Sequence, residues 1–175
     1  WVSKSDNPKR KLKYTLQIIQ ETNTKVGINT HITNKIVLDA LQNNLIGEFD
    51  KDIKIQTEVP FGSHTRFDFL ITKKNYKAFI EVKNVTLSRN KEIAEFPDAI
   101  TTRGLKHINE LLKASRKGYE IFILFLIQRD DCKYFKIAHD IDTNYSNTLL
   151  KAVKKNLKIL CYDCKFSSKG VKLNH

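Results

Sequence analysis

Three segments in the first half of the chain alternate between apolar and polar residues, which is the pattern of half-buried β-strands. They cover residues 53–59, 66–72 and 76–85. The Lys and Asn residues at 73–75 lie between the last two segments and are typical of a hairpin turn. The pattern therefore predicts three consecutive strands, the last two of which pair as a hairpin.

An almost unbroken apolar run at residues 119–128 lacks the alternation of a half-exposed strand, which is typical of a central strand buried on both sides. Apolar residues three and four positions apart predict three helices. They cover residues 32–45, 96–117 and 142–157. Two short strands, at residues 158–166 and 171–173, are expected to close the chain. The predicted order is helix, three strands, helix, strand, helix, strand, so the fold class is a mixed α/β sheet flanked by helices.

Two further strand signals precede the first helix, at residues 12–19 and 25–29. Two strands without a third do not make a stable sheet. We therefore expect residues 1–31 to be the remnant of a small β domain, and residues 32–175 to form the mixed α/β domain.

Basic residues outnumber acidic ones, with 31 Lys and Arg against 19 Asp and Glu and a formal net charge of +12. The excess lies mainly toward the two ends of the chain, whereas the middle is nearly balanced. Such a charge distribution attracts polyanions, nucleic acid among them. Solvated lysines alone would produce the same composition, so the charge by itself does not decide between the two.

The three cysteines are too few and of the wrong parity for a disulfide framework, which favours a reducing compartment and a cytoplasmic location. Cys161 and Cys164 have the spacing of half a zinc site, but only Cys132 remains to complete one, so we expect a structural role. The longest apolar run, residues 121–127, is far shorter than a membrane span. No membrane partner is therefore expected.

Asp68, Glu81 and Lys83 are the candidates for chemistry. Glu81 and Lys83 are two residues apart on a predicted strand, so their side chains leave the same face. The predicted hairpin places Asp68 within one strand spacing of Glu81. Glu58, on the preceding strand, is a candidate to join this cluster.

Carboxylates this close together repel each other and are costly to desolvate. A divalent cation removes that cost, and oxygen ligands with open positions for water and phosphate suit Mg²⁺ or Mn²⁺. Lys83 would then orient or help to deprotonate the attacking water, or neutralise charge on the phosphate. The alternative is an ordinary solvated strand face, because an Asp followed by Glu-x-Lys is a weak signal on spacing alone.

Other basic side chains are candidates for contacts with a phosphate backbone. They are Arg66 beside Asp68, Arg103, Lys106 and His107 on the second predicted helix, and Lys9, Arg10 and Lys11 in an N-terminal loop. Solvated faces and turns explain the helix and loop residues as well. His107 has a further alternative, a structural hydrogen bond near Glu81. Gln128, at the end of the buried strand, is a candidate to orient Lys83 or to contact DNA.

Several motifs occur in a fixed order along the chain. They are Arg66-Phe67-Asp68-Phe69, Ile80-Glu81-Val82-Lys83-Asn84-Val85-Thr86-Leu87, Phe96-Pro97-Asp98-Ala99 and Thr102-Arg103-Gly104-Leu105-Lys106-His107-Ile108-Asn109-Glu110-Leu111. In combination they closely resemble the sugar fermentation stimulation protein (SfsA) family. The resemblance extends essentially from Trp1 to the C-terminus, and it implies a chain truncated within its N-terminal domain.

The resemblance implies a partial OB-like β segment followed by a domain of the PD-(D/E)XK nuclease-like fold. It also implies non-specific DNA binding and a role in the regulation of sugar (maltose) metabolism. The nuclease pattern falls on Asp68 and Glu81 as metal ligands and on Lys83 as the catalytic residue, with Glu58 at an upstream acidic position. We therefore predict a non-specific DNA-binding protein. The alternative, favoured by the intact Asp, Glu and Lys set, is a Mg²⁺-dependent nuclease that hydrolyses DNA or RNA.

Overall fold

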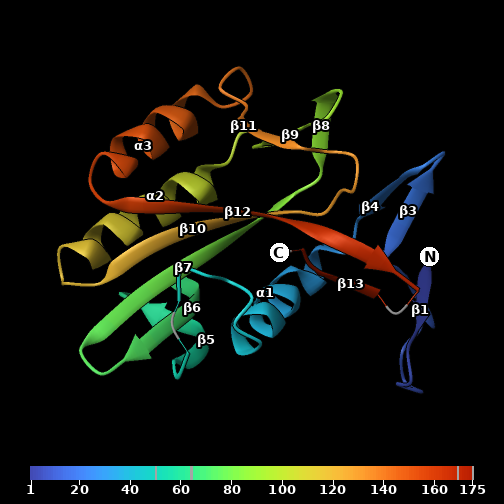
Figure 1. Ribbon diagram of the computed structural model, residues 1–175, viewed down its shortest axis with the longest axis horizontal. Coiled ribbons are helices and arrows are strands. Elements are labelled where there is room, and N and C mark those ends of the chain that lie inside the picture. Colours follow the sequence, from blue (N-terminus) through green and yellow to red (C-terminus); the bar gives the residue numbers. More distant parts are fainter. Residues whose placement is uncertain (50, 64, 169, 175) are drawn as a thin grey trace.

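The computed structural model of the chain describes residues 1–49, 51–63, 65–168 and 170–174. Within these residues a curled, six-stranded mixed sheet forms the centre of the fold, in the order β13-β12-β10-β7-β6-β5 (Figure 1). Its strands are β5 (Lys54–Phe61), β6 (Thr65–Lys73), β7 (Tyr76–Val85), β10 (Glu120–Ile127), β12 (Leu157–Ser167) and β13 (Gly170–Leu173). The predicted fold class, a mixed α/β sheet flanked by helices, is confirmed.

Strand β10 lies inside the sheet and pairs in parallel with both β7 and β12. The hairpins that join β5, β6 and β7 extend the sheet on one side, and the β12–β13 hairpin extends it on the other. Side chains of β10 enter two separate cores, since Phe122 and Leu124 belong to one hydrophobic cluster and Ile123 and Phe125 to the other. This explains why the strand has no polar face.

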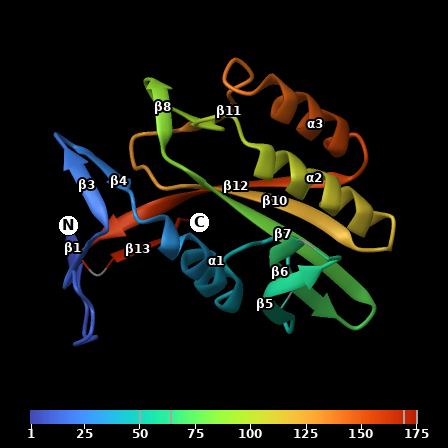
Figure 2. The same cartoon turned by 180° about the vertical axis from the view of Figure 1, so that it is seen from behind.

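Helix α1 (Thr33–Gln42) packs on one face of the sheet, whereas α2 (Thr102–Ser115) and α3 (Thr143–Val153) cover the other face (Figures 1 and 2). Helix α2 begins later than predicted because the Thr101 side chain caps it by accepting a hydrogen bond from the Gly104 amide at 3.0 Å. In the part of the chain that the structure describes, no helix is long and apolar enough to cross a membrane.

A small three-stranded sheet, which the sequence does not predict, precedes α2 and α3 in the fold. It is formed by β8 (Leu87–Asn90), β9 (Ile93–Phe96) and β11 (Tyr134–Ile137). Strand β9 leads into α2, and β11 leads into α3. Arg89 holds its edge by donating to the buried carboxylate of Glu95 at 2.8 Å and to Asp140 at 3.0 Å. The strands are four residues long and of mixed polarity, so their alternation is too short to be recognised in sequence.

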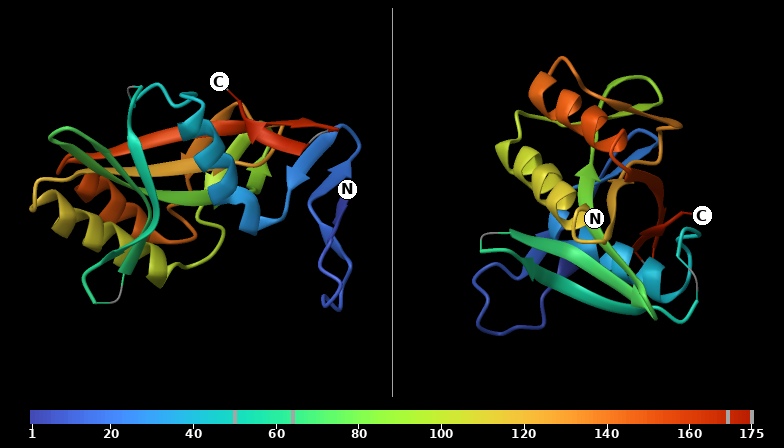
Figure 3. Two further views of the ribbon diagram at one scale, coloured as in Figure 1. Left: turned by 90° about the horizontal axis from the view of Figure 1, so that it is seen from below. Right: turned by 90° about the vertical axis from the view of Figure 1, so that its left-hand side faces the viewer.

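Two hairpins precede the main domain and project from one end of it (Figure 3). They pair β1 (Val2–Lys4) with β2 (Tyr14–Leu16), and β3 (Ile18–Glu21) with β4 (Thr24–Gly27). The single strand predicted at residues 12–19 is therefore wrong, because it is divided between two hairpins at Gln17. A short 3-10 helix, Thr30–Ile32, then leads into α1. The assignment of residues 1–31 to an OB-like remnant stays a prediction.

Gly27 joins these hairpins to the main sheet, since its amide donates to the Gln128 carbonyl at 2.9 Å. A Cβ atom at Gly27 would lie 2.4 Å from Oε1 and 3.2 Å from Cβ of Gln128, whose side chain is fully buried. We expect Gly27→Ala to lower the free energy of unfolding by about 1–3 kcal/mol, as overpacking usually does. Urea denaturation measures this.

The matched control for Gly27 is Gly47→Ala, because a Cβ at Gly47 meets nothing within 4 Å and its backbone is not left-handed. An equal loss of stability in the two variants would contradict the proposed contact between Gly27 and Gln128.

The three cysteines are free. Burial raises the pKa of the Cys164 thiol to about 12, and desolvation together with the Asp163 charge raises that of Cys161 to about 11. Reactive cysteines need a lowered thiol pKa. The structural role predicted for the Cys161 and Cys164 pair is therefore the one that the structure supports.

Candidate functional site

The β6–β7 hairpin brings the predicted acidic pair together. Phe69 pairs with Ile80, so the next position along the two strands places Asp68 beside Glu81. The Asp68 side chain also reaches this strand directly, because the Val82 amide, next to Glu81 in the chain, donates to Asp68 Oδ2 at 2.7 Å. Two carboxylates from neighbouring strands therefore face one small region of the sheet.

Glu81 is only 3 % exposed. Its Oε1 atom accepts a hydrogen bond from Lys83 Nζ at 2.7 Å and contacts His107 Nδ1, whereas Oε2 is buried and has no hydrogen-bond partner in the structure. Burial alone would raise the pKa of Glu81, but the hydrogen bond from His107 and the charge of Lys83 lower it below the ordinary value. The side chain is therefore an anion with one oxygen available to a ligand.

The pKa of Asp68 shifts in the opposite direction from that of Glu81. Burial, followed by the negative charge of Glu81, raises its pKa to about 6, although hydrogen bonds from the Val82 amide and Asn34 act against the rise. The Asn34 side chain donates to Asp68 Oδ1 at 2.7 Å. Near neutral pH the site thus holds two carboxylates, one of them ionised at a cost, which a cation would relieve.

Lys83 lies where the pattern predicts, on the same strand face as Glu81. Its side chain is 13 % exposed and its ammonium group forms the 2.7 Å ion pair with Glu81. The pairing places a positive charge directly next to the carboxylate pair, where it can stabilise negative charge on a bound phosphate.

A solvent cavity of about 680 Å³ opens beside Asp68. Its lining includes four predicted DNA contacts, Arg66, Arg103, Lys106 and His107, together with Asn34. The cavity therefore brings basic groups close to Asp68, an arrangement that suits a phosphate bound through both a cation and arginine.

Glu58 lines this cavity but does not join the carboxylate pair. It lies opposite Asp68 in the β5–β6 ladder, has a left-handed backbone with φ of 54°, and places its carboxylate 4.0 Å from Arg66 in an exposed ion pair. Across the described ranges, no three His, Cys, Asp or Glu side chains group closely enough to hold a metal ion by themselves. The structure therefore places Glu58 beside Arg66 and outside the pair formed by Asp68 and Glu81.

The remaining predicted contacts divide into two kinds. His107 is 7 % exposed and its ring contacts Glu81, as in the structural alternative, but it also lines the cavity beside Asp68, so its contact with DNA stays a prediction. Lys9, Arg10 and Lys11 are exposed in the loop between β1 and β2, outside the lining of the cavity.

Gln128 does not contact Lys83. Its Nε2 atom donates to Thr33 Oγ1 at 3.1 Å and to Asn84 Oδ1. The side chain thus links the start of α1 to the strand that carries Glu81 and Lys83. Sequence reasoning missed this link and the contact of Asn34 with Asp68, because each joins residues far apart in the chain and leaves no local pattern.

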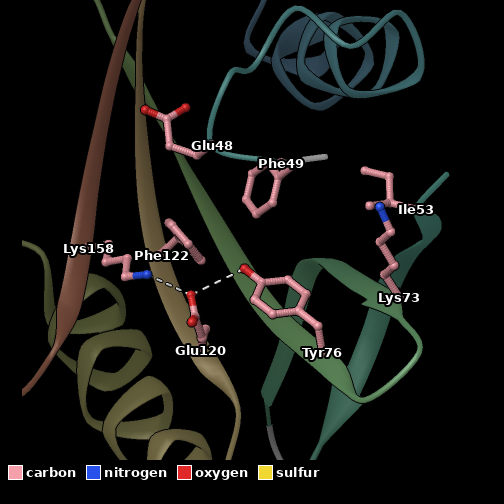
Figure 4. Close-up of a pocket in the computed structure, with 8 residues that line it drawn as sticks. All are labelled: Glu48, Phe49, Ile53, Lys73, Tyr76, Glu120, Phe122 and Lys158. Atoms are coloured by element: carbon pink, nitrogen blue, oxygen red, sulfur yellow. Dashed lines mark hydrogen bonds and ion pairs between the residues drawn. The ribbon is translucent and has the colours of Figure 1, made fainter. Parts of the chain in front are cut away.

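A second cavity, of about 380 Å³, lies on the α1 side of the sheet (Figure 4). Phe49 and Phe122 pack edge to face in it, and Glu120 accepts hydrogen bonds from Tyr76 at 3.2 Å and Lys158 at 2.7 Å. These polar groups satisfy one another, so nothing in the cavity calls for a ligand.

The fold and the site define an α/β protein with a curled mixed sheet, helices on both faces, a carboxylate pair beside a lysine, and a basic cavity that opens next to Asp68. A family model described as "Sugar fermentation stimulation protein RE domain" matches residues 31–170. The chain belongs to the SfsA family.

Its relatives and a solved structure agree with this. The chain is 51 % identical over 174 residues to the sugar fermentation stimulation protein homolog of Pelagibacter ubique, covering 99 % of this chain and 75 % of that protein. It is 43 % identical to the homolog of Desulfotalea psychrophila, covering 92 % and 68 %. A structure described as Pyrococcus furiosus SfsA in complex with Ca²⁺ superposes with a TM-score of 0.87 at 24 % identity, covering 99 % of this chain and 74 % of that one. The last comparison supports the fold.

Proposed function

We propose that this chain binds DNA through its phosphate backbone, without sequence preference. The observation that carries the proposal is the cavity next to Asp68, which Arg66, Arg103 and Lys106 line. Arginine and lysine side chains that line a cavity supply affinity for phosphate groups that does not depend on base sequence. The net charge of +12 favours the same partner.

We propose further that residues 32–175 form a PD-(D/E)XK nuclease-like domain. In its support, the order α1, β5, β6, β7, α2 and β10 places the acidic residues on the second and third strands, with the lysine two positions after Glu81. A partial OB-like segment before it, and a role in sugar (maltose) metabolism, follow from the family resemblance and stay predictions.

The carboxylate pair fits a divalent cation such as Mg²⁺ or Mn²⁺. Glu81 Oε2 is buried without a partner, and the pKa of Asp68 is raised to about 6 by burial and by Glu81, so a cation would satisfy the first and ease the second. Two protein carboxylates are enough, because Mg²⁺ is commonly held by one or two carboxylates with substrate phosphate and water. The relative from Pyrococcus furiosus is described as a complex with Ca²⁺, which also prefers oxygen ligands.

The second candidate function is metal-dependent hydrolysis of DNA or RNA phosphodiesters, and the convergence of Asp68, Glu81 and Lys83 favours it. When bound, a divalent cation would polarise the phosphate and activate water. Asp68 and Glu81 would hold the cation, and the Lys83 ammonium group would stabilise the charge that develops on the phosphate. Incubation with plasmid, linear duplex and single-stranded substrates, with and without Mg²⁺ or Mn²⁺, tests this candidate, and an absence of cation-dependent cleavage would contradict it.

The proposal of DNA binding predicts a specific salt dependence. The double variant Arg66→Ala and Arg103→Ala is expected to reduce the slope of log Kd against log salt by about 2, since each lost phosphate contact removes about 0.9. Fluorescence anisotropy with a labelled duplex measures the slope. A control with the same charge is Lys154→Ala with Lys155→Ala, two exposed lysines outside the cavity. Equal effects of the two double variants would show that only net charge matters.

A further inference from the structure

The outward face of α2 carries a regular row of charged residues. Arg103, Lys106, Glu110, Lys113 and Lys117 follow one another at intervals of three and four. Residues at such intervals lie above one another on a helix, so the row forms one stripe along α2 and its C-terminal extension. Only its first two members belong to the residues proposed above for DNA binding.

The stripe forms one wall of a groove. A cavity of about 520 Å³ adjoins the one beside Asp68, and the two share the turn residues Gly62, Ser63 and Thr65 as well as Lys106. Their union runs between the β5–β6 turn and α2, away from the carboxylate pair. The stripe is therefore not a convex, freely solvated surface but the side of a depression that begins at the candidate site.

This cavity of about 520 Å³ is strongly basic. Its lining contains Lys106, Lys113, Arg116 and Lys117 against a single acidic residue, Glu110. Lys113 forms a 2.7 Å ion pair with Glu110, and Lys117 Nζ lies 5.1 Å from the centre of the Phe61 ring. These contacts hold two of the cations against the walls of the groove, which reduces the entropy lost when an anion binds.

The length of the groove suits a polyphosphate chain. Helix α2 has 14 residues, which at the rise of an α-helix corresponds to about 21 Å. Successive phosphates of one strand are separated by about 3.4 Å along the duplex axis and by more along the strand itself, so the groove faces several of them. A single small anion would use only a fraction of this length.

We propose that the groove between α2 and the β5–β6 turn binds the sugar-phosphate backbone of one nucleic-acid strand, from the cavity beside Asp68 to Arg116 and Lys117. The inference rests on the proposed DNA binding and extends it. It assigns Lys113, Arg116 and Lys117 to the interface, none of which the sequence motifs indicate. It also predicts a direction, since the strand leaves the carboxylate pair toward the C-terminal end of α2.

The test compares two triple variants that remove the same charge. Lys113→Ala, Arg116→Ala and Lys117→Ala change the groove, whereas Lys151→Ala, Lys154→Ala and Lys155→Ala change exposed residues at the end of α3. Anisotropy with labelled duplexes at several salt concentrations gives the slope of log Kd against log salt. The groove variant is expected to lose about 2–3 from the slope, and the α3 variant less than about 1.

The outcomes separate this inference from the function on which it rests. If the wild-type chain binds DNA and the groove variant keeps its slope, or if both variants lose it equally, the inference is overturned while DNA binding stands. If the wild-type chain binds no DNA at any salt concentration, both are overturned. Circular dichroism and thermal unfolding establish that the variants are folded.

Glu110→Gln provides a test that loss of structure cannot imitate. Among the described residues, it removes the only carboxylate that lines the cavity of about 520 Å³, and it releases Lys113 from its ion pair. Binding is expected to tighten by up to about fivefold, the factor that corresponds to an exposed charge pair. Weaker binding by this variant would contradict the assignment of the groove.

Discussion

Lys83→Met is expected to lower Mg²⁺-dependent cleavage of duplex DNA by about 100-fold or more, the usual cost of removing one preorganised group that stabilises developing charge. Methionine keeps most of the length and apolar volume of lysine while removing the ammonium group. DNA affinity should change by less than about threefold, because Lys83 is 13 % exposed and paired with Glu81. Plasmid nicking and anisotropy, measured on the same preparation, give the two quantities.

Lys77→Met is the matched control for this experiment. Lys77 lies on the same strand as Lys83 but is exposed and does not line the cavity. Its variant should cleave like the wild type. Cleavage at wild-type rates by Lys83→Met, or an equal loss in both variants, would contradict the role assigned to Lys83. A chain that binds DNA but shows no cation-dependent cleavage would support the binding function and remove the nuclease candidate.

Asp68 is expected to make the folded protein less stable as the pH rises. Its carboxyl pKa is about 6 in the folded state, against an ordinary value of 3.8, so the folded state binds the proton more tightly than the unfolded state. Stability therefore falls with increasing pH between these two values and stays low above them. The full difference corresponds to about 3 kcal/mol, and about 2 kcal/mol of it falls between about pH 4.5 and 7.5.

The measurement compares the wild type with Asp68→Asn by urea unfolding across that pH range. Loss of a hydrogen bond to Asn34 or to the Val82 amide shifts the variant by a constant amount, so the pH-dependent part of the difference isolates the carboxyl group. Asp98→Asn, at an exposed position, is the control. A difference between wild type and Asp68→Asn that does not change with pH would contradict the burial of an ionised Asp68.

Binding of a divalent cation should remove most of the loss of stability that ionised Asp68 causes. If Asp68 and Glu81 hold Mg²⁺ or Mn²⁺, either ion should raise the unfolding temperature of the wild type in proportion to the logarithm of its concentration, and should not raise that of Asp68→Asn. This readout does not depend on cleavage. It therefore tests the cation site even if the chain proves to be a DNA-binding protein without nuclease activity.

The Asp68 and Glu81 pair illustrates what local pattern is able to predict. Alternation with a period of two determines which side chains share a strand face, and a tight turn at residues 74–75 determines which residues of the two strands meet. Both depend on a short stretch of chain. Glu58 shows the limit of this reasoning, because its backbone φ of 54° and its ion pair with Arg66 draw its carboxylate away from the pair.

Contacts between distant elements could not be predicted in the same way. The sequence left a phosphate contact, a solvated face and a hydrogen bond near Glu81 open for His107, and the packing of α2 on the sheet brings its ring to Glu81. Gln128 bonds to Thr33 across 95 residues, and Asn34 to Asp68 across 34. Each contact depends on how two elements pack, which is decided by the shapes of both surfaces together.

By itself, the sequence determined the class of fold, the central buried strand and the meeting of Asp68, Glu81 and Lys83, because strand periodicity and hairpin register are local properties of the chain. Only the tertiary structure decided that His107 contacts Glu81, that Glu58 pairs with Arg66, and that α2 and the β5–β6 turn enclose a basic groove. Those features arise where separate elements pack against one another, and the relative placement of two surfaces is not encoded in either one alone.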